Sequence, residues 1–237
     1  MPTVILACSS LIPYVDAAQE KMNTSWPVVS VDRALHAEPA DMKAAIAEKI
    51  AALCQKAKQA DSSGQAQDST TELTVLVAMG FCGGTWDHVS FPCRVVIPRV
   101  DDCISLLLTC TDEYCPNRKE PGHLYLYEND PADFSALKLL RDGGSADPDL
   151  KNMSHADLFR YWFSGYHAMD IIDTGLNPCY EVPYVQAAQK EADAINADLG
   201  YAQGSICLLE KLVSGRWDDQ FLVLEPGRTA LHGDFFE

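Results

Sequence analysis

Short, almost wholly apolar runs that alternate with helical segments are the feature that most limits the fold of this chain. Such runs occupy residues 3–7, 27–31, 73–79 and 94–97. They are typical of strands in a parallel sheet buried on both faces, because a strand with one solvated face alternates apolar and polar side chains. We therefore predict an α/β fold with a mainly parallel sheet and helices on both faces, in a Rossmann-like, doubly wound arrangement.

The remaining segments are assigned by the spacing of their apolar residues. We expect helices at residues 11–22, 41–58 and 104–108, with Ser9 or Ser10 capping the first, and a polar loop at residues 59–71. Later elements are an edge strand, two long helices, a segment of undecided type and a final strand, at residues 123–128, 154–173, 183–199, 206–213 and 221–224. The chain is thus expected to be a single α/β domain over residues 1–237. It can be subdivided into an α/β core, 1–115, and a helix-rich C-terminal half, 116–237.

The charge of the chain is strongly negative and unevenly placed. The formal charge is −16, and residues 101–237 carry 24 acidic and 10 basic side chains, against 10 and 8 in residues 1–100. Binding to nucleic acid or to an anionic membrane surface depends on clustered Lys and Arg, so we expect neither. The acidic surface is either a solvated face or a docking face for a basic partner.

Nine cysteines occur in a chain that starts without the basic leader and long apolar run of a signal peptide. No apolar run has the length of a membrane span. We therefore expect a cytoplasmic protein, whose thiols stay reduced, and the odd number of cysteines agrees with this. The cysteines are then packing residues, metal ligands or nucleophiles rather than disulfides.

Three of these cysteines follow the predicted strands. Cys8 follows the first, Cys82 follows the strand at residues 73–79, and Cys103 follows the strand at residues 94–97. Ligands of open parallel sheets bind at the carboxyl ends of the strands. If these strands are parallel neighbours, the three thiols face one crevice.

A histidine extends this set of potential ligands. His36 lies in the loop after the strand at residues 27–31, which also ends at the carboxyl edge of the predicted sheet. Three thiols and one imidazole suit zinc, or iron with an open position. We therefore predict a metal site of Cys8, Cys82, Cys103 and His36, with His36 alternatively a merely exposed loop residue.

Other residues beside the thiols have two possible roles each. Gly83 and Gly84 bare backbone amides that can cradle an anion, or they form a tight turn. Arg99 can clamp a carboxylate or phosphate of a substrate or cofactor, or pair with Asp101 or Asp102. Asp101 and Asp102 can support a cation or act in catalysis, and at least one of them is expected to cap the following helix.

The motifs around these residues resemble a known family. The run Gly80–Gly84 (Gly-Phe-Cys-Gly-Gly) and the segment Val96–Ile104 are similar to the signature of domain-of-unknown-function family 1638. An opening strand that ends in a cysteine, Cys8, a His-x-x-Pro element, His36–Pro39, and a Gly-x-Trp-Asp turn, Gly215–Asp218, extend the resemblance. The family usually has His-Asp-Cys where this chain has Asp-Asp-Cys, so any role of that histidine passes to Asp101 or is lost.

The resemblance implies a connection with one-carbon metabolism. Members of the family resemble accessory proteins found with corrinoid-dependent methyl-transfer systems. An enzyme or accessory factor of this kind would act on a small-molecule substrate, or on a corrinoid or methyltransferase partner protein, and a corrinoid would reach it through that partner. The metal would act as a Lewis acid on a small thiol or methyl donor, or the protein would deliver a metal or a corrinoid partner.

Two other functions remain open from the residues. In a metal-independent enzyme, Cys82 would be the nucleophile and His36 its base, and the amides of Gly83 and Gly84 would stabilise an oxyanion. In a non-catalytic interaction protein, the acidic C-terminal part would dock a partner.

Overall fold

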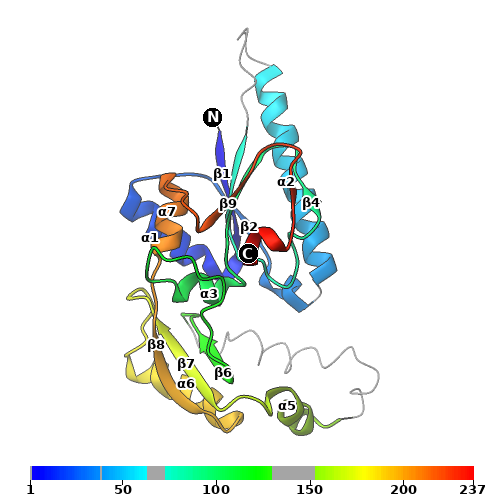
Figure 1. Ribbon diagram of the computed structural model, residues 1–237. Helices are drawn as coiled ribbons and strands as arrows, with labels where there is room; N and C mark the ends of the chain where they lie inside the picture. The colour runs from blue at the N-terminus through cyan, green and yellow to red at the C-terminus, as the bar shows by residue number, and fades with distance from the viewer. Residues whose placement is uncertain (1, 38, 63–72, 130–152) are drawn as a thin grey trace. The chain divides into compact units, whose positions relative to one another are not determined.

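The computed structural model describes residues 2–37, 39–62, 73–129 and 153–237 (Figure 1). The chain forms two compact units, Met1–Asn117 with Ile206–Glu237, and Arg118–Ser205. The subdivision predicted at residues 115 and 116 stays a prediction. Among the described residues, no helix is both long and apolar enough to span a membrane.

A five-stranded, mostly parallel sheet organises the first unit, in the order β2-β1-β3-β5-β9. Its strands are β1 (Thr3–Cys8), β2 (Val28–Val31), β3 (Thr74–Ala78), β5 (Arg94–Pro98) and β9 (Phe221–Leu224). The first four are mutually parallel and β9 is antiparallel to β5. All five residues of the central strand β3 are buried, as its unbroken apolar run predicts. The α/β class and the mainly parallel sheet are therefore confirmed.

Helices and short elements connect these strands. They are η1 (Ser9–Leu11), α1 (Ile12–Met22), η2 (Arg33–Ala37), α2 (Pro39–Ser62), β4 (Val89–Ser90), α3 (Cys103–Leu108), α7 (Cys207–Ser214), β10 (Thr229–Ala230) and α8 (Gly233–Phe236). α1 packs beside α7 in Figure 1, and β10 pairs with β4. The segment of undecided type is thus the helix α7. The prediction that helices cover both faces of the sheet is not confirmed.

The second unit contains a three-stranded parallel sheet, β6-β7-β8. Its elements are β6 (His123–Leu126), α5 (His155–Phe163), β7 (Ala168–Asp173), α6 (Val182–Ala194) and β8 (Asp198–Gln203). The long helix predicted at residues 154–173 was wrong beyond Phe163, and the one at residues 183–199 was wrong beyond Ala194. A helix-rich C-terminal half is therefore not confirmed.

Two local predictions also need correction. Neither Ser9 nor Ser10 caps α1, because a 3₁₀ turn precedes this helix and its N-cap is Leu11. The predicted loop at residues 59–71 starts later, because α2 continues to Ser62. Residues 63–71 of that loop lie outside the described residues.

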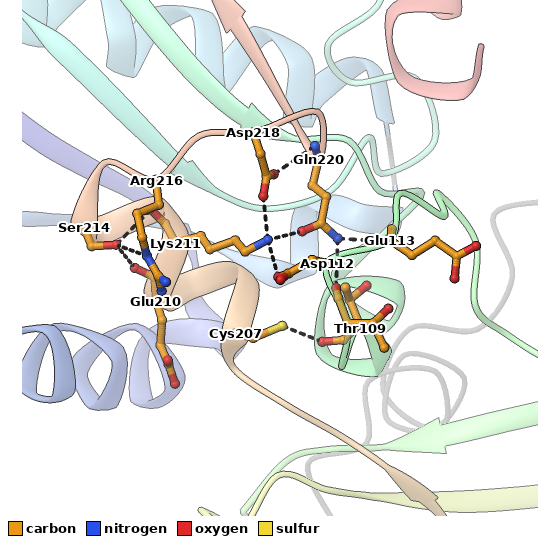
Figure 2. Close-up of polar contacts among 11 residues, drawn as sticks. Thr109, Asp112, Glu113, Cys207, Glu210, Lys211, Ser214, Arg216, Asp218 and Gln220 are labelled. Carbon is orange, nitrogen blue, oxygen red and sulfur yellow. Dashed lines mark hydrogen bonds and ion pairs between the residues drawn. The ribbon is translucent and has the colours of Figure 1, made fainter.

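A buried lysine fixes the segment that follows α3 (Figure 2). The Nζ atom of Lys211, on α7, lies 2.6 Å from a side-chain oxygen of each of Asp112, Asp218 and Gln220. Burial lowers the pKa of Lys211, but the hydrogen bonds to the two carboxylates raise it by more. The ammonium group therefore stays charged and links α7 to two chain segments that have no regular secondary structure.

The same segment supports the loop that precedes α3. The carbonyl oxygen of Pro116 accepts a hydrogen bond of 2.7 Å from the backbone N–H of Asp101. Gln220 donates from Nε2 to the carbonyl oxygens of Thr111 and Glu113. The segment at residues 111–116 is thus hydrogen-bonded both to Gln220 and to the loop at residues 99–102, and it holds that loop in place.

Candidate metal centre

Four potential ligands follow the four parallel strands of the first unit. His36 lies in η2 after β2, Cys8 ends β1, Cys82 follows β3, and Cys103 is the first residue of α3 after β5. In the sheet order, they stand at consecutive carboxyl ends. The chain passes from β1 to β2 on one side and then returns to β3 on the other, so the β1–β3 boundary is a topological switch point, where open α/β sheets bind ligands.

Three of these residues form a compact group. The ligand atoms of Cys8, His36 and Cys103 all lie within 4.8 Å of one another. Bonds of about 2.3 Å to a tetrahedral zinc would bring two sulfurs to about 3.8 Å, so the two sulfurs need to approach each other by no more than about 1 Å. Cys8 and Cys103 are buried and His36 is half-buried. The group can hold a metal ion.

Cys82 lies beside this group and not within it. Its thiol is close enough to that of Cys103 to raise the pKa of Cys103, and Cys103 in the same way raises the pKa of Cys8. Cys103 is thus the middle member of a row of three thiols. The structure therefore brings all four predicted ligands to one place but groups His36 with Cys8 and Cys103.

Close backbone packing places Cys82 beside Cys103. The N–H groups of Phe81 and Cys82 donate to the carbonyl oxygens of Val100 and Asp101, at 2.8 and 2.7 Å. A Cβ atom on Gly80 would lie 2.6 Å from the Cα atom of Asp102, so only glycine allows this approach. The loops after β3 and β5 are in this way joined along their backbones.

The backbone at Cys82 has an unusual conformation. Its φ angle is +49°, and Gly83 and Gly84 follow at +69° and +94°. Positive φ is costly for most residues that carry a Cβ atom, and strain of this kind is often found at functional sites. Thr85 holds the turn, because its hydroxyl donates to the carbonyl oxygen of Cys82 at 2.9 Å.

Hydrogen bonds also join the loops after β1 and β2. The hydroxyl of Ser9 accepts a 3.1 Å hydrogen bond from the backbone N–H of Arg33, the first residue of η2. Ser10 Oγ lies 3.1 Å from the Cys8 sulfur. At His36, Nδ1 is buried and has no hydrogen-bond partner among the described residues. A buried ring nitrogen without a partner is costly, and a metal ion bound at this nitrogen would remove that cost.

The pKa values of the group favour neutral side chains in the metal-free state. The hydrogen bond to Cys103 and burial raise the pKa of Cys8 far above its usual range. For Cys103, the hydrogen bond with Cys8 lowers the pKa, but the hydrogen bond with Cys82 and burial raise it by more. Burial lowers the pKa of His36, although the Asp102 carboxylate opposes this.

Comparison with known families agrees with the motifs at these loops. The family described as "Protein of unknown function (DUF1638)" matches residues 30–213. The chain belongs to the DUF1638 family. No curated protein and no solved structure gives a significant match.

The DUF1638 match includes His36, Cys82 and Cys103, whereas Cys8 and the turn Gly215–Asp218 lie outside the matched residues. Cys8 is nevertheless the residue that completes the compact group. Of the His-x-x-Pro element, Glu38 lies outside the described residues.

The remaining predicted site residues of this DUF1638 protein lie in the chain segments next to Cys82 and Cys103. Asp102 is the N-cap of α3 and accepts a 2.8 Å hydrogen bond from the N–H of Ser105, so the expected capping is confirmed. Asp101 and Asp102 are half-buried beside Cys103. Gly83 is exposed and Gly84 half-buried, at the surface of the Cys82 turn.

Arg99 is directed towards the C-terminal segment. Its guanidinium donates to the carbonyl oxygens of Asp219, Asp234 and Glu237, at 2.7 to 2.9 Å, and it lies over the ring of Tyr114. These contacts hold the Arg99 side chain in place. Binding of a substrate or cofactor by Arg99 stays a prediction.

Sequence reasoning missed the support that the C-terminal residues give to the Cys82 loop. The ring of Phe81 packs against those of Phe235, Phe236 and His232, with centroid distances of 4.8, 5.2 and 5.4 Å. The closing Phe-Phe pair of the sequence is the signal that could have suggested a buried anchor, since Phe235 is fully buried.

Proposed function

We propose that this protein binds a transition metal, zinc or iron, through Cys8, His36, Cys103 and Cys82. The observation that carries the proposal is the approach of three ligand atoms, from the end of β1, from η2 and from the start of α3, to within 4.8 Å of one another. Thiolates and imidazole are the ligands that zinc and iron prefer in proteins.

Packing alone gives a weaker account of this group. Buried cysteines are common in cores, but a buried imidazole nitrogen without a partner is unfavourable. Strain at Cys82 and the backbone approach at Gly80 both bring a thiol towards Cys103. A metal ion bound by the thiols would offset the free-energy cost of the unpaired nitrogen and of the strained backbone.

Around the proposed metal, the acidic residues have supporting roles. Asp102 raises the pKa of His36 and caps α3, so its carboxylate can orient the ligands from outside the coordination sphere. Catalytic roles for Cys82, Asp101 and Asp102 belong to the proposal, as does anion binding by Gly83, Gly84 and Arg99.

The proposed biological setting is an enzyme or accessory factor of corrinoid-linked methyl transfer, with the metal as a Lewis acid. This setting rests on the family resemblance alone. A metal-independent role for Cys82 with His36 as its base has less support, because His36 groups with Cys8 and Cys103. An acidic docking role is compatible with the charge of −16, but no contact within the described residues favours it.

The experiment that tests the metal centre is an anaerobic zinc titration that also measures proton release. We expect one zinc ion per chain and the release of at least two protons, from Cys8 and Cys103, because raised pKa values keep both thiols protonated at neutral pH. His36 should release none, since its lowered pKa leaves it neutral.

Because zinc competes with protons for these thiols, its affinity should rise with pH. Tight binding without proton release, or an affinity that falls between pH 6 and pH 8, would contradict the proposed ligand set.

A further inference from the structure

Cys82 differs from the other proposed ligands in three respects. Its thiol is outside the group formed by Cys8, His36 and Cys103. Its backbone has a φ angle of +49°. It is also joined to the row of thiols at one end, through Cys103. A ligand at the end of the row can leave without separating the other three.

The residues before Cys82 are fixed by packing and hydrogen bonds, whereas the two glycines after it are open to solvent. Phe81 is packed against the C-terminal rings, and the fully buried Trp86 donates to the carbonyl oxygen of Gly80 at 2.8 Å. In contrast, Gly83 is exposed, and a Cβ atom on Gly84 would meet no atom within 4 Å. The open side of Cys82, which is itself only 8% exposed, is therefore the turn at Gly83 and Gly84.

Exchange of this ligand would require only a small movement. The N–H and C=O groups of Cys82 are both hydrogen-bonded, to the carbonyl of Asp101 and to the hydroxyl of Thr85. The backbone can thus remain in place while rotation about the Cα–Cβ bond takes the sulfur to another staggered position. The vacated position suits a sulfur, because a sulfur occupied it.

We propose that the Cys82 position is where the site takes its substrate, a small thiol whose sulfur replaces that of Cys82. The inference rests on the proposed metal centre. In the exchange, the bond between the metal and the Cys82 sulfur breaks and a bond to the incoming sulfur forms. The proton of the incoming thiol passes to the Cys82 thiolate, and no electron is gained or lost.

Cobalt(II) makes this exchange visible, because thiolate ligands give it charge-transfer absorption and a tetrahedral site gives it strong d–d bands. Cys82→Gly removes the thiol and suits the positive φ angle, so this variant should unfold at no lower urea concentration than the wild type. With cobalt, it should lose the share of charge-transfer intensity that belongs to one of three thiolates. 2-Mercaptoethanol should restore that intensity, while ethylene glycol, its hydroxyl analogue, should not.

Each other outcome has a definite meaning. If Cys82→Gly and Cys82→Ala bind no cobalt, Cys82 is a fixed structural ligand, which overturns the exchange. An unchanged spectrum in Cys82→Gly overturns the exchange and removes Cys82 from the ligand set, which leaves a centre of Cys8, His36 and Cys103. No response to 2-mercaptoethanol overturns the exchange alone. Absence of cobalt binding by the wild-type protein overturns the metal centre and the exchange together.

Discussion

Serine in place of Cys103 should lower the affinity for zinc by at least about 100-fold, because even the loss of an outer-shell partner weakens metal binding by 10- to 100-fold. Cys103 is the middle member of the row of thiols and belongs to the compact group with Cys8 and His36. A serine hydroxyl is a much poorer zinc ligand than a thiolate. Isothermal titration under anaerobic conditions measures the effect.

Cys54→Ala is the matched control for this variant. Cys54 lies on α2 and is as buried as Cys103, with 5% exposure for each. It has no place in the compact group, so its replacement should leave zinc affinity unchanged. Equal affinities of Cys103→Ser and the wild type would show that zinc binds elsewhere.

Alanine in place of Gly80 should destabilise the protein by about 2–3 kcal/mol, the upper part of the range for overpacking. The added Cβ would lie 2.6 to 2.7 Å from the Cα, C and N atoms of Asp102. These are backbone atoms of the residue that caps α3, so no side chain can rotate away. The loops after β3 and β5 would separate, which moves Cys82 away from Cys103.

Urea unfolding of the metal-free protein measures this change, with Gly165→Ala as the control. A Cβ on Gly165 would have no neighbour within 4 Å, so that variant should stay within about 0.5 kcal/mol of the wild type. Similar stability of the two variants would mean that the backbone approach at Gly80 is unimportant.

The elements that build the site were predictable from the sequence, because each strand is an apolar run too short for a helix. The thiols at the strand ends could be brought together on topology alone, since parallel neighbours end at one edge of a sheet. The position of each thiol relative to the others could not be predicted. That Cys82 stands beside the group depends on its φ angle and on the contact between Gly80 and Asp102, which no spacing encodes.

The second unit was predicted less well for a similar reason. Residues 155–163 are amphipathic and form α5, but the short segment at residues 168–173 (Ala-Met-Asp-Ile-Ile-Asp) does not show by its own pattern whether it continues that helix or forms a strand. Hydrogen-bonded pairing with β6 and β8 stabilises this segment as the strand β7 rather than as a helix. Such pairing is a tertiary contact that local periodicity does not contain.

X-ray absorption spectroscopy of the zinc-loaded protein tests the metal centre most directly. We expect sulfur neighbours at about 2.3 Å together with nitrogen at about 2.0–2.1 Å, and a reduced sulfur contribution in Cys8→Ser. A coordination shell of oxygen and nitrogen alone, or a spectrum that Cys8→Ser leaves unchanged, would contradict a centre built from Cys8, His36 and Cys103.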